Sequence, residues 1–282
     1  MPGESRLRGE DALPVLGAAW RRFLHIDGLQ RAAAFSYSAF FSLFPGILLT
    51  VTAASYFLSP GEASSLVLNF IGNLVPYGAG VSKAVFQTLS RLAQARGQAG
   101  ALALLMLVWT ASQVFTTLIQ ATNRAWGTQG TNWWKLPLKS LALLAVTAFA
   151  VLAGIAIPIA ARVAAGVLHS TVIVPAAHRL TLFVLPWAAV FLCLAFFYRL
   201  APHRRTAYSE VRLAALLATL LLFAAQSAFV FYLRHFASLN AVYGAFGGLM
   251  ALMLWIYISG IIFIFCACLS AAQAAAAGRA HG

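Results

Sequence analysis

Few residues of this 282-residue chain could support hydrolytic or metal chemistry. Only six residues are acidic, and they are Glu4, Glu10, Asp11, Asp27, Glu62 and Glu210. The six histidines are scattered, with no His-x-His or His-x-x-Glu spacing. Metal-dependent hydrolysis of a phosphodiester needs several Asp, Glu or His ligands that converge on one or two cations. A Ser-His-Asp hydrolase needs an acid that orients its histidine. We therefore expect no enzymatic activity, no metal site and no cofactor.

Polar side chains recur at helical spacing within the apolar stretch 99–122 and just beyond it. They are Thr110, Gln113, Thr116, Thr117, Gln120, Asn123 and Arg124. At about 100° per residue these side chains share one face roughly 140° wide. In lipid an unpaired polar group is costly, so this face must meet other helices or a water-filled cavity. Both alternatives stay open, because Thr and Gln also hydrogen-bond one membrane helix to another.

A second polar set, Arg212, Thr219 and Gln226, recurs every seven residues and so lies nearly on one helix face. It could meet the first set across a helix bundle. The candidate substrate cavity is then lined by Gln113, Thr117, Gln120, Asn123, Arg124, Thr219 and Gln226. No carboxylate lies deep in an apolar stretch, so lipid movement, passive conduction or anion binding fits better than proton coupling through Asp or Glu.

Composition identifies the elements that must position these residues. The chain is 62% hydrophobic and 9% charged, whereas soluble domains average about 25% charged. We predict an all-α integral membrane protein with six spans, at about 32–58, 99–122, 136–160, 180–200, 213–233 and 247–272. Residues 1–31 would form a cytoplasmic segment with an amphipathic helix, which lies at the membrane interface or packs on its own domain. We also predict an extracytoplasmic helical hairpin between the first two spans and a cytoplasmic tail at 273–282.

The distribution of Lys and Arg predicts the orientation in the membrane. With the N-terminus in the cytoplasm, 13 of the 19 Lys and Arg residues fall in cytoplasmic segments and six fall outside, as the positive-inside rule requires. The candidate basic mouth on the cytoplasmic side consists of Arg199, Arg204, Arg205 and Arg212. It could attract anionic lipid headgroups, or it could serve topology alone. Because the basic residues are spread over the ends of apolar stretches, we expect no nucleic-acid partner.

Small residues and one proline mark positions where helices could pack closely or bend. Gly244 and Gly248 are four residues apart, as are Gly247 and Ala251. This spacing lets another helix approach, either for packing, including a homo-oligomer, or as a sliding surface. Pro45 lies inside the first span, where it removes one backbone hydrogen bond and favours a kink.

Four stretches resemble the bacterial YihY/BrkB family of inner-membrane proteins. They are AAAFSYSAFFSLFPGIL at 32–48, Asn123 to Trp126, Tyr198 to Pro202, and VYGAFGGLMALMLWIYISG at 242–260. The resemblance implies a six-helix protein of the bacterial inner membrane with both ends in the cytoplasm. Members of the family have been labelled ribonuclease BN, serum-resistance factor and lipid-related transporter. The last span departs from the family pattern, because Cys266-Ala-Cys268-Leu-Ser270 stands where Gly-Ala-Glu-Leu-Asn is common.

Two functions from different classes follow from these patterns. The first is a transporter or flippase-like protein that handles lipid or another anionic, amphipathic substrate through the polar cavity. The second is a non-transporting scaffold, or envelope-integrity factor, that binds lipids and partner proteins. Ribonuclease activity is not expected, because no acid lies between Glu62 and Glu210.

Overall fold

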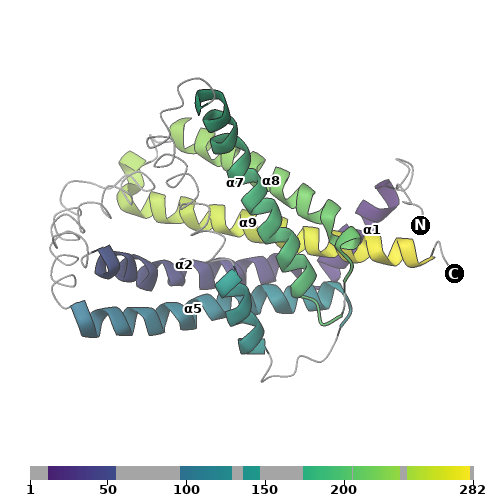
Figure 1. Cartoon of the computed structure of the whole chain (residues 1–282), viewed down its shortest axis with the longest axis horizontal. Helices are drawn as coiled ribbons and strands as arrows, with labels where there is room; N and C mark the ends of the chain where they lie inside the picture. Colours follow the sequence, from purple (N-terminus) through teal and green to yellow (C-terminus); the bar gives the residue numbers. More distant parts are fainter. Residues whose placement is uncertain are drawn as a thin grey trace. The chain divides into compact units, whose positions relative to one another are not determined.

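The computed structural model describes residues 12–54, 96–128, 136–146, 174–204, 206–235 and 240–279. These residues contain seven helices and no strand, which confirms the all-helical class for the described part of the chain. The helices are α1 (Ala12–His25), α2 (Gly28–Ala54), α5 (Arg96–Ala125), the helix Leu136–Val146, α7 (Val174–Leu200), α8 (Tyr208–His235) and α9 (Asn240–Arg279) (Figure 1).

Three of the described helices are long and apolar enough to cross a membrane. They contain the segments Leu104–Ala125, Glu210–Tyr232 and Leu249–Ala277, which correspond to the predicted spans at 99–122, 213–233 and 247–272. Helices α2, Leu136–Val146 and α7 overlap the other three predicted spans. The predicted hairpin between the first two spans, Arg205 and the last residues of the tail lie outside the described residues.

The chain forms two compact units. Unit 1 comprises Met1–Leu29, Leu118–Phe223 and Ile262–Gly282, and unit 2 comprises Gln30–Thr117 and Ala224–Ile261. Helices α5, α8 and α9 each contribute residues to both units. The N-terminal helix, the end of α9 and the connection between α7 and α8 therefore all belong to unit 1.

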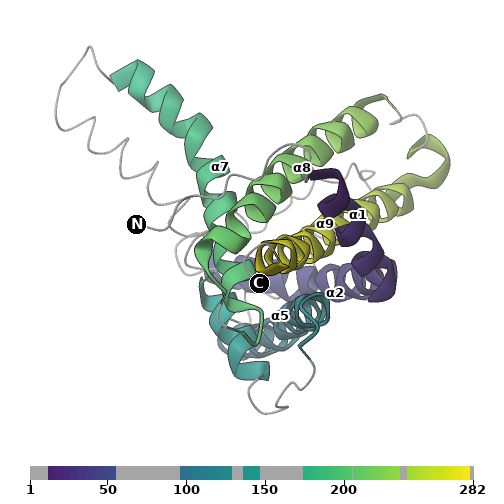
Figure 2. The ribbon, with the colours of Figure 1, turned by 90° about the vertical axis from the view of Figure 1, so that its right-hand side faces the viewer.

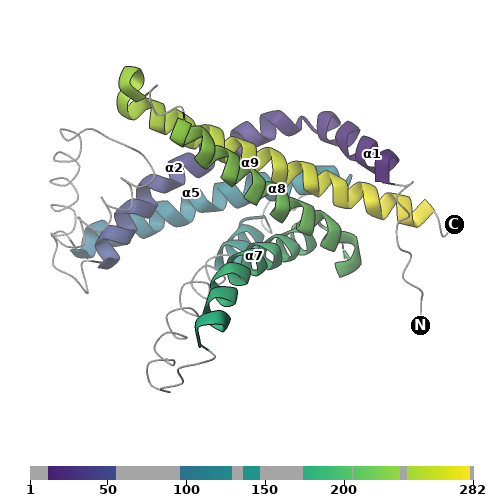
Figure 3. The ribbon, with the colours of Figure 1, turned by 90° about the horizontal axis from the view of Figure 1, so that it is seen from above.

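In unit 2, α2 packs on α5 and on the N-terminal part of α9. Helices α2 and α5 lie side by side (Figures 1 and 3). The Ser36 hydroxyl donates a hydrogen bond to the carbonyl of Met253 on α9, at 3.0 Å. At Gly260 the two backbones approach closely, since a Cβ atom there would lie 2.8 Å from Cδ1 of Phe35 and 3.4 Å from Cα of Ala32. A small residue is therefore required at this crossing.

In unit 1, α1 crosses and packs against the C-terminal part of α9 (Figures 2 and 3). Val15 and Ala19 are buried in one cluster with Leu269 and Ala272. The large apolar residues on the adjoining part of the α1 surface remain exposed; they are Leu13, Leu16, Trp20 and Leu24. Part of the predicted amphipathic face of α1 therefore packs on its own unit. The remaining apolar side chains are exposed, as a place at the membrane interface would require.

Candidate functional site: a polar junction of helix ends

In unit 1, a set of polar contacts joins the end of α5, the start of the helix Leu136–Val146 and the connection between α7 and α8. We call this set the polar junction. It consists of Arg22, Asn123, Trp126, Thr128, Lys139, His203, Arg204, Thr206 and Glu210. Its members come from helix ends, where backbone carbonyls and N–H groups lack partners within their own helix.

Helix α5 ends in a Schellman motif that fixes the position of Asn123. Gly127 has a φ of 67°, a left-handed conformation that glycine adopts without steric cost. Its N–H donates to the carbonyl of Arg124, and the N–H of Thr128 donates to the carbonyl of Asn123, both at 3.0 Å. These two bonds form the hydrogen-bond pattern of this helix cap.

The remaining carbonyls at the end of α5 are also paired. The N–H of Trp126 donates to the carbonyl of Thr122 at 3.0 Å. Nη1 of Arg22, from α1, donates to the carbonyl of Ala125 at 2.9 Å. A cation at this position also interacts favourably with the negative end of the helix dipole. The last turn of α5 is thus held by the residues that follow it and by Arg22 of α1.

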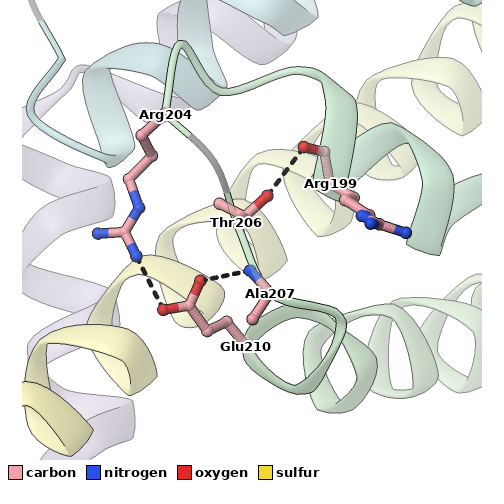
Figure 4. Close-up of polar contacts among 5 residues, drawn as sticks. All are labelled: Arg199, Arg204, Thr206, Ala207 and Glu210. Carbon is pink, nitrogen blue, oxygen red and sulfur yellow. Dashed lines mark hydrogen bonds and ion pairs between the residues drawn. The ribbon is translucent and has the colours of Figure 1, made fainter.

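The end of α7 is held by two side chains. Nζ of Lys139 donates to the carbonyls of Ala201 and Pro202, at 2.8 and 3.0 Å. The hydroxyl of Thr206 donates to the carbonyl of Arg199 at 2.8 Å (Figure 4). Pro202 follows the last helical residue closely, as expected of a residue that cannot continue a helix.

Asn123 joins α5 to the connection between α7 and α8. Its side-chain oxygen Oδ1 accepts a hydrogen bond from the backbone N–H of His203 at 2.9 Å, and the Thr128 hydroxyl lies 3.3 Å from the same oxygen. Because a backbone N–H can only donate, this contact fixes which end of the amide carries the oxygen. Asn123 is 2% exposed. This candidate cavity residue therefore also helps to hold the junction together.

Arg204 contacts both α5 and α8. Its Nη2 donates to Oε1 of Glu210 at 2.8 Å (Figure 4), and its Cζ lies 4.5 Å from the centroid of the Trp126 ring. Oε2 of Glu210 accepts from the N–H of Ala207 at 3.0 Å, which is one half of a capping box at the start of α8. Glu210 is therefore fixed by its own helix, whereas the Arg204 side chain is 44% exposed.

The candidate cavity residues are divided between the two units. Gln120, Asn123, Arg124 and Thr219 belong to unit 1, and Gln113, Thr117 and Gln226 belong to unit 2. Three glutamines and Arg124 are exposed, whereas Asn123 and Thr219 are buried. The hydroxyls of Thr117 and Thr219 donate to the carbonyls of Gln113 and Ala215, four residues earlier in their own helices. These two hydroxyls are paired without water or a second helix.

The remaining candidate residues are the arginines of the basic mouth, Pro45 and the glycines of α9. Arg199, Arg204 and Arg212 of the predicted basic mouth are exposed, and of these only Arg204 uses its side chain in the junction. Pro45 is buried inside α2, which continues through it. Gly244, Gly247 and Gly248 lie in the first part of α9, and their surroundings lie outside what the structure describes. A close helix approach is seen at Gly260.

Comparison with known families places the chain among membrane proteins. The family described as virulence factor BrkB matches residues 19–281. The chain belongs to the BrkB family. This BrkB-family chain is 28% identical over 261 residues to the UPF0761 membrane proteins of Xanthomonas campestris pv. campestris (strain B100) and Xanthomonas axonopodis pv. citri (strain 306). The match covers 91% of this chain and 60% of each of those proteins.

A relative of similar length occurs in Bacillus subtilis (strain 168). It is the ribonuclease-like protein YfkH, which is 27% identical over 265 residues, or 89% of this chain and 92% of YfkH. No solved structure matches this BrkB-family chain. In the part of the chain that the structure describes, no group of three or more His, Cys, Asp or Glu residues could hold a metal ion.

Sequence reasoning missed several residues of the junction. In the sequence, Lys139 is only one of the basic residues near a span, and Trp126 is only part of a family-like stretch. Outside the junction, the role of Tyr198 is not visible in the sequence either. The Tyr198 side chain is fully buried, and its hydroxyl donates to the carbonyl of Phe263 at 3.0 Å. One available signal was Glu210, which is the only acid after residue 62 and lies close to Arg204 and Arg205 in the sequence.

Proposed function

We propose that this BrkB-family chain is a transporter or flippase-like protein of the bacterial inner membrane that handles lipid or another anionic, amphipathic substrate. In this proposal the chain has six spans, an extracytoplasmic hairpin between the first two, and both termini in the cytoplasm. The observation that carries the proposal is the exposure of Gln113 and Gln226 within the membrane-crossing segments Leu104–Ala125 and Glu210–Tyr232.

An exposed glutamine in the middle of a span needs a polar environment. Moving an unpaired amide from water into hydrocarbon costs roughly 2–7 kcal/mol. Gln113 and Gln120 are seven residues apart on α5, so both amides lie on nearly the same face of that helix. A water-filled cavity, or the polar part of a substrate, would satisfy these amides. The same face of α5 carries the exposed Arg124 at its cytoplasmic end.

The charge of unit 1 supports an anionic substrate. The exposed arginines Arg124, Arg199 and Arg212 lie in this unit. Four of its five acids lie within the first 27 residues, and the fifth, Glu210, is already paired with Arg204. A basic surface of this kind raises the local concentration of anions and attracts anionic headgroups. One unit contains α1, the end of α9, the basic residue Lys139 and the connection between α7 and α8, which supports the proposed orientation.

Cysteine labelling tests the cavity directly. Gln113→Cys is introduced into a background without Cys193, Cys266 and Cys268, and intact membranes are treated with a water-soluble maleimide. The matched control is Leu220→Cys, because Leu220 is 48% exposed and lies near the middle of another membrane-crossing segment. We expect Gln113→Cys to react and Leu220→Cys to remain unlabelled. If neither residue reacts, no aqueous cavity reaches Gln113 and the transport proposal is wrong.

Lipid movement is measured separately, in proteoliposomes with a fluorescent phospholipid and an external quencher. The double variant Gln113→Leu/Gln120→Leu should slow the loss of inner-leaflet fluorescence relative to the unaltered protein. Unchanged movement in this variant would remove these amides from the pathway.

The alternative function is a non-transporting scaffold that binds lipids and partner proteins, including a second copy of the chain. The hydrogen bonds of Thr117 and Thr219 within their own helices favour it, because dry helix packing tolerates such residues. A scaffold requires the exposed glutamines to be covered by protein. Failure of Gln113→Cys to react in membranes, followed by reaction after the protein is purified as a monomer, would support the scaffold. Neither function requires an enzyme, a cofactor or nucleic acid.

A further inference from the structure

We infer that Asn123, Trp126 and Arg204 form a binding site for a phosphate group, carried by a lipid headgroup or by a soluble phosphate. The inference rests on the proposed function and identifies the part of the anionic substrate that the junction recognises. It starts from two buried donors in the described part of unit 1 that have no acceptor: Nδ2 of Asn123 and Nε1 of Trp126.

Unpaired buried donors are rare in folded proteins and call for an explanation such as a missing ligand or water. The orientation of the Asn123 amide is not ambiguous, since Oδ1 accepts the N–H of His203 at 2.9 Å. Nδ2 must therefore occupy the other end of the amide. A flip of the amide would instead place Nδ2 against the N–H of His203, so that two donors would face each other.

The two donors belong to residues three apart at the C-terminal end of α5, Asn123 in its last turn and Trp126 directly after it. Asn123 and Trp126 are three residues apart, and the N–H of Trp126 continues the helical bonding pattern to Thr122, so both side chains project from one side of the turn. This turn is held by its Schellman motif and by Arg22. The donors are therefore presented by a fixed backbone, which is the arrangement that a specific site needs.

The third donor, the Arg204 guanidinium, covers the Trp126 ring at 4.5 Å. It is held there by one ion pair to Glu210, and its side chain is 44% exposed. Glu210 keeps its bond to the N–H of Ala207 whether or not Arg204 is present. We infer that phosphate takes the place of the Glu210 carboxylate as the partner of Arg204 and accepts hydrogen bonds from the donors of Asn123 and Trp126.

Phosphate fits this set of donors better than a carboxylate does. It offers three or four acceptor oxygens in a tetrahedral arrangement, and guanidinium groups bind it with two parallel hydrogen bonds. The amide of Asn123 and the indole of Trp126 each donate one further bond. Lys139 is occupied by the carbonyls of Ala201 and Pro202, so it contributes charge without direct contact.

Calorimetric titration of the full chain in detergent micelles tests the site at about 150 mM salt, where the Debye length of about 8 Å limits long-range attraction. The two probes are dihexanoyl phosphatidic acid, a soluble lipid, and inorganic phosphate. Trp126→Phe removes Nε1 and keeps an aromatic ring under Arg204, and we expect it to weaken binding about tenfold, as the loss of one hydrogen bond to a charged acceptor predicts. The matched control, Trp109→Phe, alters an exposed tryptophan of unit 2 and should leave binding unchanged.

A second variant changes binding in the opposite direction. Glu210→Gln retains an oxygen for the N–H of Ala207 but releases Arg204, so phosphate should bind several-fold more tightly. If Trp126→Phe does not purify as a folded protein, Arg204→Gln replaces it, because the Arg204 side chain is 44% exposed and its loss should also weaken binding about tenfold.

The outcomes separate the site from the proposed function. Binding of phosphatidic acid alone identifies a headgroup site, and equal binding of both probes identifies recognition of phosphate itself. Equal affinity in Trp126→Phe and the unaltered protein, or no binding of either probe, overturns the inference. Because the titration involves no movement across a membrane, a phosphate site can stand when Gln113→Cys fails to react, and the reverse also holds.

Discussion

Replacing Gly260 with alanine should destabilise unit 2, although the same change stabilises most helices. An alanine Cβ at this position would lie 2.8 Å from Cδ1 of Phe35 and 3.4 Å from Cα and Cβ of Ala32. Overpacking of this kind costs about 1–3 kcal/mol, whereas alanine gains about 1 kcal/mol over glycine in a helix interior. The free energy of unfolding should therefore fall by about 1 kcal/mol, the difference between these two terms. The matched control is Gly17→Ala in α1, where nothing lies within 4 Å of the added Cβ.

The assay is thermal unfolding of the purified protein in one detergent. Unfolding is monitored as the loss of the monodisperse peak in size-exclusion chromatography after heating. A change of 1 kcal/mol shifts the Tm of a protein of this size by about 2–4 °C, so Gly260→Ala should lower the Tm and Gly17→Ala should raise it. In a Phe35→Ala background the ring is absent, and Gly260→Ala should no longer lower the Tm. The reasoning is refuted if Gly260→Ala raises the Tm as Gly17→Ala does, because the helices would then not approach closely at Gly260.

Two further predictions concern the contacts that hold unit 1 together. Lys139→Met removes two charge-assisted hydrogen bonds from the end of α7, and at about 1.5 kcal/mol or more for each bond the Tm should fall by several degrees; a Tm equal to that of the unaltered protein would show that water replaces the ammonium group. Tyr198→Phe removes the buried bond to the Phe263 carbonyl and should cost about 0.5–1.5 kcal/mol, whereas the same change at the exposed Tyr208 should have no effect on the Tm.

The sequence was sufficient to predict the all-helical class and three helices long and apolar enough to cross a membrane, because apolar content and periodicity determine both. It could not predict the partners of the polar residues of α5. Asn123 belongs to the polar stripe, yet its acceptor oxygen meets the N–H of His203, 80 residues later, and that contact depends on how the helices are placed. The Thr117 hydroxyl donates to a carbonyl of its own helix. Periodicity does not determine whether such a hydroxyl pairs within its helix, with another helix or with water.

The glycines illustrate the same distinction. Small residues four apart, such as Gly244 and Gly248, indicate where a helix could be approached. Whether a helix crosses at a given glycine depends on its partner. At Gly260, which has no small residue four positions away, α2 places Phe35 and Ala32 against the backbone. A small-residue motif describes the surface of one helix, whereas a packing contact also depends on the surface of the second helix.

The position of α1 determines the order in which unit 1 can be completed during synthesis. Arg22 donates to a carbonyl 103 residues later, and Trp20 and Phe23 pack near Phe265 of the last helix. At 5–20 residues per second, α1 leaves the ribosome roughly 12–50 s before α9 is made. During this interval its apolar face must be covered by the bilayer surface or by another protein. Helix α1 is therefore made well before α9 but reaches its final place only after it, and removal of either helix removes the same contact.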